Sequence, residues 1–204
     1  MKELIIVRHG QADHMVSGKT GGWTDSHLTD LGREQAKLTG QHLAGLVGDR
    51  AFDFYSSDLA RAAETAELIG ESISVRPVLV SNLRELNNGQ AANLSQAEAE
   101  KIANPITEPL ADWRPYPGAE SWREMSDRVV GFLESVREGK DLALMVLHGG
   151  SANAAILWWL DLGIAEANIS FELDPCSISR FNVNRWNERS VVKANDTAHI
   201  RRLS

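Results

Sequence analysis

The segment Leu4-Ile5-Ile6-Val7-Arg8-His9-Gly10 joins a short, continuous apolar run to an arginine, a histidine and a glycine. A continuous apolar run is typical of a strand that is buried on both faces of a mostly parallel sheet. A second run of this kind, Leu142–Leu147, is followed by His148-Gly149-Gly150. Because the carboxyl ends of parallel strands meet at one edge of the sheet, His9 and His148 are expected to lie close together.

Weaker strand signals surround these two runs. The candidates are Phe52–Tyr55, Ser74–Val80, Ile169–Leu173, Ser177–Asn184 and Ser190–Lys193. The last two flank Trp186-Asn187, which predicts a hairpin.

Four helices are predicted between the strands. Thr29 can cap the first, which carries Ala36, Leu43 and Val47 on one face. The second begins near Asp58, the third opens with the capping-box pattern Ser121-x-x-Glu124, and the fourth follows Gly149-Gly150 and runs through Trp158-Trp159. This alternation predicts an α/β fold, a three-layer αβα sandwich with a mostly parallel central sheet.

Length, composition and net charge exclude several classes of protein. The 204 residues suit a single domain, residues 1–204, and the formal net charge of −7 argues against a nucleic-acid partner. No apolar run is long enough for a signal peptide or a membrane span, so no membrane partner and a cytoplasmic location are expected. The single cysteine, Cys176, excludes an intramolecular disulfide and is expected to be buried.

Three of the polar residues at the predicted sheet edge and nearby helix ends suit phosphate chemistry. Imidazole, as in His9, can attack phosphorus because its neutral form is abundant near neutral pH. Arginines such as Arg8 and Arg61 offer a planar fork that fits two phosphate oxygens, and Gly149 opens a helix whose N–H groups can face an oxyanion. The alternatives are a hydrogen-bonded core role for His9 and a surface ion pair of Arg61 with Glu64 or Asp58.

Four motifs occur one after another along the chain, and their order can be compared with that of known families. They are Arg8-His9-Gly10, Ser57-Asp58-Leu59-x-Arg61-Ala62-x-x-Thr65-Ala66, Leu83-Arg84-Glu85 and His148-Gly149. Lesser matches are Thr24-Asp25-x-x-Leu28-Thr29-x-x-Gly32, Pro117-Gly118-Ala119-Glu120-Ser121 and Asn195-Asp196-Thr197-x-His199. In this order the sequence resembles the histidine phosphatase superfamily, also called the phosphoglycerate-mutase-like family.

The resemblance implies a role for each matched residue. His9 would be the nucleophile that becomes phosphorylated, while Arg8, Arg61, His148 and the Gly149 backbone would bind the transferring phosphoryl group. Glu85 would protonate the leaving alcohol and then deprotonate water. Such a site needs positioning and charge neutralisation, which these residues could supply with no metal and no other cofactor.

The sequence departs from the family pattern in two places. Position 15, where many relatives have asparagine, is Met15, so His14 or Ser17 is the candidate replacement for that phosphate contact. The stretch after Glu85 lacks the aromatic residues common in relatives, and Glu120 is the alternative carboxylate, although a helix-end charge is the simpler reading of it. Asp13-His14 with His27 and His42 matches no metal-site spacing.

Three functions remain open at this point. The chain length favours a phosphomonoester hydrolase that acts through phosphohistidine on a small phosphorylated metabolite, with residues 86–120 as a candidate lid. A phosphoglycerate-type mutase and a non-catalytic phosphate-binding or interaction module are the alternatives. The leaving group and the oligomeric state are not encoded in these motifs, and the candidates for the outer pocket are Arg84, Arg114, Arg123 and Trp113.

Overall fold

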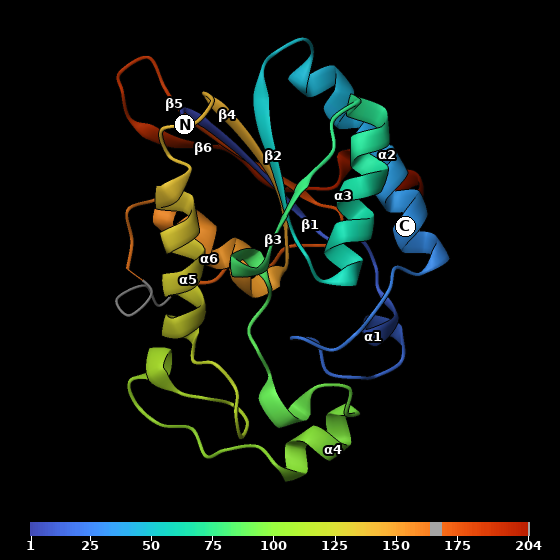
Figure 1. Cartoon of the computed structure of the whole chain (residues 1–204), viewed down its shortest axis with the longest axis vertical. Coiled ribbons are helices and arrows are strands. Elements are labelled where there is room, and N and C mark those ends of the chain that lie inside the picture. The colour runs from blue at the N-terminus through green and yellow to red at the C-terminus, as the bar shows by residue number, and fades with distance from the viewer. Residues whose placement is uncertain (164–168, 204) are drawn as a thin grey trace.

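The computed structural model describes residues 1–163 and 169–203 and contains one six-stranded sheet (Figure 1). Its strands are β1 (Glu3–Arg8), β2 (Phe52–Ser57), β3 (Val78–Val80), β4 (Leu142–Leu147), β5 (Ile178–Val183) and β6 (Arg189–Asp196). The strand order is β3-β2-β4-β1-β5-β6. The first four strands are parallel to one another, β5 is antiparallel to β1, and β6 is antiparallel to β5. The parallel strands therefore all end at one edge, as the sequence predicts.

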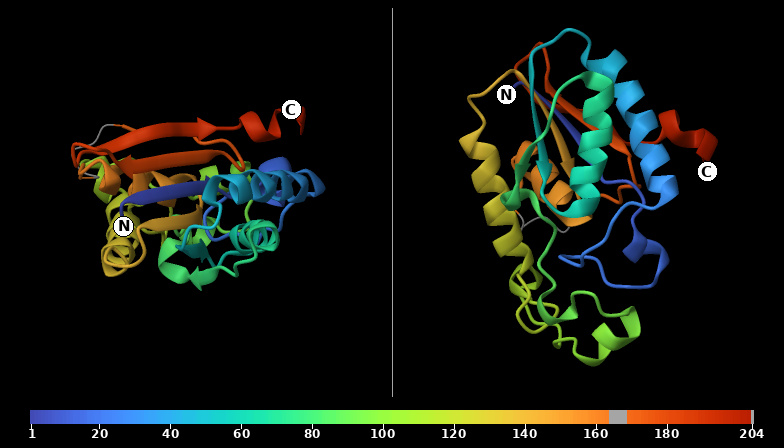
Figure 2. Two further views of the ribbon diagram at one scale, coloured as in Figure 1. Left: turned by 90° about the horizontal axis from the view of Figure 1, so that it is seen from above. Right: turned by 45° about the vertical axis from the view of Figure 1, so that its right-hand side comes forward.

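Helices cover both faces of this sheet, which confirms the three-layer α/β architecture. On one face lie α2 (Asp30–Val47) and α3 (Ala60–Ile73), and on the other lie α5 (Trp122–Ser135) and α6 (Gly149–Trp159) (Figures 1 and 2). The short helices α1 (Asp13–Val16) and α4 (Gln96–Lys101) lie beyond the carboxyl ends of the parallel strands (Figure 1). Short 3-10 helices occupy Ser81–Leu83, Gly89–Ala91, Leu110–Asp112 and Ala198–Leu203.

The continuous apolar runs are buried because both faces of the sheet are covered. Leu4 and Ile6 pack with α5 and α6, whereas Ile5 and Val7 pack with α2 and α3. All six residues of β4, the strand next to β1, are buried. Packing on both faces fixes the position of the central strands, and therefore also the position of the residues at their carboxyl ends.

Helix starts follow the predicted capping residues. The Thr29 hydroxyl accepts a hydrogen bond from the Gly32 N–H, and Ser121 and Glu124 form the reciprocal capping box of α5. The helix expected from Asp58 begins two residues later, with Leu59 as its N-cap. Cys176 is buried, as expected, and so are Trp158 and Trp159.

The strand predicted for Ser74–Val80 is shorter in the structure. Only Val78–Val80 of Ser74–Val80 forms a strand, because α3 extends to Ile73 and Ser74 caps it in the left-handed conformation, with φ of 54°. The hairpin at Trp186-Asn187 is confirmed.

The strand predicted for Ile169–Leu173 is wrong. No strand forms there, because the Asn153 side chain binds both backbone polar groups of Phe171: Oδ1 accepts from its N–H over 2.6 Å and Nδ2 donates to its carbonyl over 2.9 Å. These bonds replace those that a neighbouring strand would supply.

The segment 86–120 wraps the end of the molecule that carries α4 (Figure 1). It contains α4 and two 3-10 turns, and its backbone is tied to the loop before α2 through the bridge between Lys19 and Ser95. Within the described residues, no helix has the length and apolar character needed to cross a bilayer.

Candidate active site

His9 follows the last residue of β1 and is 2% exposed. Its Nδ1 lies 2.8 Å from the Gly10 carbonyl oxygen, which can only accept, so Nδ1 carries the proton. Nε2 accepts a hydrogen bond from Nε of Arg61 over 3.3 Å. The imidazole is therefore neutral with its lone pair on Nε2, which is the form that a nucleophile requires.

The surroundings keep His9 unprotonated. Burial lowers the pKa of His9 well below its ordinary value of 6.5, and the nearby guanidinium groups of Arg61 and Arg8 lower it further. At neutral pH this histidine therefore carries no proton on Nε2.

The backbone just after His9 packs closely against the backbone of the first turn of α2. A Cβ on Gly10 would lie 2.7 Å from the Gly32 carbonyl oxygen, and a Cβ on Gly32 would lie 2.0 Å from the Gln11 carbonyl oxygen. The Gly10 N–H donates to Oγ1 of Thr65 over 3.1 Å. Glycine is thus needed at both positions for the chain that follows β1 to pack against the start of α2.

Arg61, in the first turn of α3, is 1% exposed. Besides its bond to His9, it donates to the carbonyl oxygens of Gly22 over 2.7 Å and Thr24 over 3.2 Å. Burial lowers its pKa to about 10, so it stays cationic at neutral pH. The surface ion pair with Glu64 or Asp58 is not formed: Glu64 binds His27, and Asp58 binds Arg84.

His148 is the N-cap of α6 and is completely buried. Its ring centroid lies 5.0 Å from that of His9, so the structure brings together the two histidines that follow the apolar runs. Nε2 lies 2.8 Å from Oγ of Ser57, while Nδ1 is buried with no hydrogen-bond partner among the described residues. Burial lowers the pKa of His148 well below 6.5, and Arg61 adds to this effect.

Arg8 completes the cationic side of the site. Its Nη1 donates to the Leu173 carbonyl oxygen, and its Nε is buried with no partner among the described residues. Burial lowers the pKa of Arg8, while the charges of Glu85 and Asp174 raise it. Unpartnered buried donors are costly, so Arg8 and His148 leave hydrogen-bonding capacity that an anion could use.

Glu85 faces this cluster from the segment after β3. Its Oε2 accepts from the Gly150 N–H over 2.8 Å, and its Oε1 accepts from the Leu86 N–H over 2.8 Å. One of the helix-entry N–H groups predicted to face an oxyanion is therefore bound to this carboxylate. Gly149, the first residue of α6, lies beside it: a Cβ there would be 3.8 Å from Oε2 of Glu85.

Sequence reasoning missed the side chains that hold Glu85 in place. Arg128 donates to the carbonyl oxygens of Glu85 over 2.7 Å and Arg84 over 2.8 Å, and it forms a two-point ion pair with Glu120. Nε1 of Trp23 donates to the Glu85 carbonyl oxygen over 2.7 Å. Glu120 is thus engaged in a structural ion pair, and no local sequence pattern connects residues 85 and 128.

Of the candidate replacements at position 15, the structure brings His14 to the site. The His14 ring centroid lies 6.0 Å from that of His9, and its Nδ1 lies 2.9 Å from Oγ of Ser26. Burial, with Arg61 and Arg8, lowers the pKa of His14 to about 4. Met15 and Ser17 are exposed.

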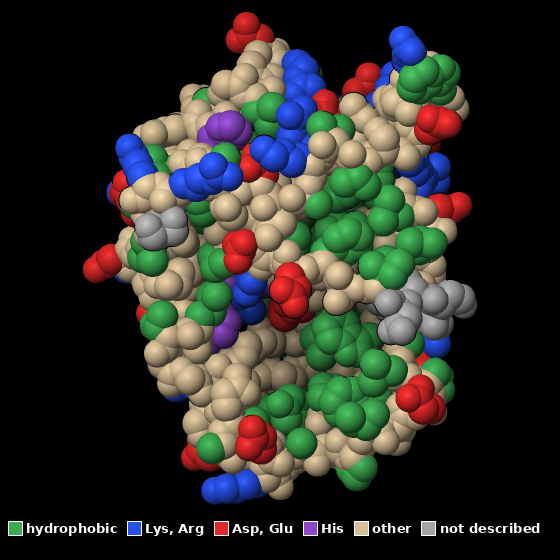
Figure 3. Space-filling model, turned by 180° about the vertical axis from the view of Figure 1, so that it is seen from behind, with side chains coloured by type: hydrophobic (Ala, Val, Ile, Leu, Met, Phe, Trp, Pro, Cys, Tyr) green, Lys and Arg blue, Asp and Glu red, His purple; other side chains and the backbone are tan. Residues whose placement is uncertain are grey.

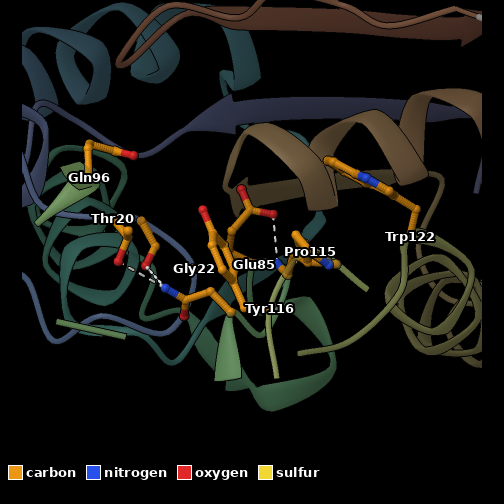
Figure 4. A pocket seen from close by; sticks show the side chains of 10 residues that line it. Thr20, Gly22, Glu85, Gln96, Pro115, Tyr116 and Trp122 are labelled. Atoms are coloured by element: carbon orange, nitrogen blue, oxygen red, sulfur yellow. Dashed lines mark hydrogen bonds between the residues drawn. The ribbon is translucent and has the colours of Figure 1, made fainter. Parts of the chain in front are cut away.

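A pocket of about 250 Å³ opens beside Glu85 (Figure 4). Its lining is Thr20, Gly21, Gly22, Glu85, Leu86, Asn88, Gln96, Pro115, Tyr116 and Trp122. Figure 3 shows histidine and Lys or Arg side chains set in a hollow of the molecular surface, with an acidic side chain and hydrophobic groups at its edge. A small organic group could therefore lie against Glu85 while its phosphate reaches the cationic cluster.

None of the four residues expected to shape the outer pocket belongs to this lining. Arg84 forms a two-point ion pair with Asp58, and Arg114 binds Glu124 and the Ala119 carbonyl oxygen. Arg123 binds Asp112, and Nε1 of Trp113 donates to the Pro105 carbonyl oxygen. Within the described residues, no group of three His, Cys, Asp or Glu side chains is placed to hold a metal ion.

Comparison with known proteins gives a consistent family. The model of the histidine phosphatase superfamily (branch 1) matches residues 4–197. A Hydrogenobacter thermophilus protein named "Putative phosphoserine phosphatase 2" is 30% identical over 214 residues and is covered, like this chain, to 100%. The "Probable phosphoglycerate mutase GpmB" of Salmonella paratyphi C is 32% identical over 211 residues, which covers 98% of this chain and 95% of that protein.

Solved structures agree with this assignment. A mycobacterial glucosyl-3-phosphoglycerate phosphatase in complex with VO3 superposes with a TM-score of 0.80 at 25% identity, covering 97% of this chain and all of that one. YhfR of Bacillus stearothermophilus has the same fold, with a TM-score of 0.80 at 23% identity over 98% of this chain and 100% of that one.

Proposed function

This chain belongs to the histidine phosphatase superfamily (branch 1), and we propose that it hydrolyses small phosphate monoesters through a phosphohistidine formed on His9. The observation that carries the proposal is the state of His9. It is a buried, neutral imidazole whose proton is held on Nδ1 by the Gly10 carbonyl and whose Nε2 faces the guanidinium of Arg61. A core histidine would not need an arginine directed at its lone pair.

In the first half-reaction, Nε2 of His9 attacks phosphorus and the bond between phosphorus and the ester oxygen breaks. Glu85 gives its proton to the departing oxygen, which leaves as an alcohol. Arg8, Arg61, His148 and the N-terminal backbone of α6 at Gly149 neutralise the charge on the phosphoryl oxygens. The unpartnered Nε of Arg8 and Nδ1 of His148 support this assignment, because the oxygens of a bound phosphate would supply the acceptor that each of them lacks.

In the second half-reaction, the Glu85 carboxylate takes a proton from water as the water oxygen attacks phosphorus. The bond from phosphorus to Nε2 breaks, inorganic phosphate leaves, and His9 is neutral again. The same carboxyl group thus serves first as acid and then as base. His14 is the candidate for the phosphate contact that Met15 cannot make, because its ring faces the same cluster.

The size of the pocket beside Glu85 supports a small metabolite as substrate. The names of the relatives make phosphoserine and glucosyl-3-phosphoglycerate the first natural esters to assay, together with 3-phosphoglycerate for a mutase activity. Release of inorganic phosphate, with no isomeric phosphate ester formed, would support hydrolysis over a mutase reaction, in which the phosphoryl group returns to another hydroxyl of the substrate.

The proposal is tested by trapping the enzyme during turnover of a labelled phosphate ester. We expect acid-labile, alkali-stable label on the peptide that contains His9, and no label or turnover in His9→Ala. His27→Ala is the matched control, because His27 is an exposed histidine paired with Glu64 outside the site. Rapid turnover without label on that peptide, or strong inhibition by EDTA, would contradict the mechanism.

A further inference from the structure

The pocket beside Glu85 has walls of two kinds (Figure 4). Leu86, Pro115, Tyr116 and Trp122 supply apolar and aromatic surface, and the remaining lining is glycine or uncharged polar side chains apart from Glu85 itself. Among the described residues, Glu85 is thus the only charged residue that lines the pocket, and no lysine or arginine does.

Besides Arg8 and Arg61, which are assigned to the phosphoryl group, the arginines on the segments around the pocket are paired with carboxylates. Arg84 stacks on Trp23, with its guanidinium 4.7 Å from the ring centroid, and is held by Asp58. Arg114 is bound to Glu124 and Arg128 to Glu120. Lys19 precedes the lining residue Thr20, but its side chain is exposed. Each fixed guanidinium is therefore already neutralised by a carboxylate, which reduces its attraction for a second anion.

The polar groups of the lining have unequal capacity for a ligand. Asn88 is fully used: its Nδ2 donates to Oγ1 of Thr20 and to the Gly21 carbonyl oxygen, and its Oδ1 accepts from the Trp23 N–H. By contrast, the Tyr116 hydroxyl has no hydrogen-bond partner among the described residues, and Nε2 of Gln96 makes only a long bond of 3.4 Å to the Lys19 carbonyl oxygen. The available groups are neutral donors and acceptors.

Given the proposed function, we propose that this pocket selects phosphate esters whose leaving alcohol carries no charge. A carboxylate or second phosphate on that alcohol would enter a pocket whose described lining offers no fixed cation as a partner. Desolvating such an anion without a partner is costly. An uncharged alcohol can instead pack on Tyr116 and Trp122 and bond to the free hydroxyl of Tyr116.

Two esters of equal size test this selectivity. 4-(Hydroxymethyl)phenyl phosphate is neutral beyond its phosphate, whereas 4-carboxyphenyl phosphate carries one additional carboxylate. We expect kcat/KM to be at least about tenfold higher for the neutral ester, since desolvating a charge without a partner costs more than the equivalent of a factor of ten. Equal values, or a preference for the carboxylate, would overturn the proposal.

A variant with a positive charge added to the pocket lining tests the same selectivity from the side of the protein. Gln96 is exposed at the start of α4, so Gln96→Lys can add a cation at the pocket without removing a buried contact. We expect this change to raise the ratio of kcat/KM for the carboxylate ester to that for the neutral ester at least about fivefold. Gln41→Lys, on exposed surface of α2, adds the same charge elsewhere and should leave the ratio unchanged. A ratio that changes equally in both variants would refute a local effect.

Binding measured with His9→Ala separates this proposal from the proposed function. If His9-dependent hydrolysis is absent, the proposed function fails, yet the affinities of the two esters for this variant still report on the pocket. Tighter binding of the neutral ester by at least about tenfold would support the selectivity, and equal or reversed affinities would remove it.

Discussion

The Gly150 N–H donates to Oε2 of Glu85 over 2.8 Å, and a Cβ on Gly150 would lie only 2.3 Å from Oε1 of the same carboxylate. The start of α6 therefore sets the position of the proposed acid. Because the same helix begins with His148 as its N-cap, one helix end holds two of the proposed functional groups. This relationship makes the steric size of residue 150 a direct test of the role of Glu85.

Gly150→Ala should lower kcat by about tenfold or more, because the methyl group displaces the Glu85 carboxylate from the leaving oxygen. The loss should be larger for an alkyl phosphate, which needs protonation of its leaving group, than for 4-nitrophenyl phosphate, which needs it less. Steady-state kinetics with both esters measure this difference. Gly131→Ala is the matched control, since no heavy atom lies within 4 Å of a Cβ at that position of α5. Equal losses with both esters would argue against Glu85 as the acid.

Arg61→Ala should reduce the single-turnover rate by about a hundredfold or more, by analogy with the loss of one oxyanion donor. Arg61→Lys should recover only part of the rate, because an ammonium group cannot donate to His9, Gly22 and Thr24 in the geometry of a guanidinium. Circular dichroism of each variant verifies folding, and Arg33→Ala, which removes an exposed arginine, serves as the control. A rate within threefold of wild type for Arg61→Ala would exclude Arg61 from phosphoryl binding.

Arg128→Met should both destabilise the protein and disturb the acid. The ion pair with Glu120 is mostly buried, so its loss is expected to cost on the order of 2–3 kcal/mol in the free energy of unfolding. Arg137→Met removes an exposed pair with Glu134 and should cost less than about 1 kcal/mol. Urea unfolding measures both.

A purely structural role for Arg128 would lower activity equally for all esters. Because Arg128 also binds the Glu85 carbonyl, we expect the decrease in kcat at permissive temperature to be larger for the alkyl phosphate than for 4-nitrophenyl phosphate. An unaltered ratio between the two esters would limit Arg128 to stability.

The buried histidines should make the protein less stable on acidification. The folded-state pKa values of His9 and His148 lie well below 6.5, and that of His14 is about 4, so the unfolded chain binds more protons below pH 6.5. Their contribution is fully present above pH 6.5 and is lost as the pH falls towards the folded-state values. Each fully buried histidine adds a slope of up to about 1.4 kcal/mol per pH unit within its window.

Urea unfolding between pH 6.5 and 5.0 measures this slope. His14→Gln should make it shallower, whereas His27→Gln should leave it unchanged. The pKa of His27 is raised by its bond to Glu64, so its contribution is lost as the pH rises above 6.5, outside this range. A free energy of unfolding that stays constant from pH 6.5 to 5.0 would contradict the assigned protonation states.

Sequence signals that act over a few residues were sufficient to predict most of the architecture. The apolar run before Arg8, the Thr29 cap and the Ser121 capping box each act within a few residues, so they could be read directly and are present in the structure. The run Ile169–Leu173 had the composition of a strand but lost its backbone bonds to Asn153, which is distant in sequence. Strand propensity could not anticipate that competition.

Sequence alone identified the buried central strands, the neighbouring positions of His9 and His148 and the polar groups suited to phosphate. It could do so because strand periodicity and the end of a strand are properties of adjacent residues. Tertiary packing decided the rest: the contact of Gly150 with Glu85, the support from Arg128 and the uncharged walls of the pocket. These depend on residues tens of positions apart, whose distances are set only when the helices and loops pack against the sheet.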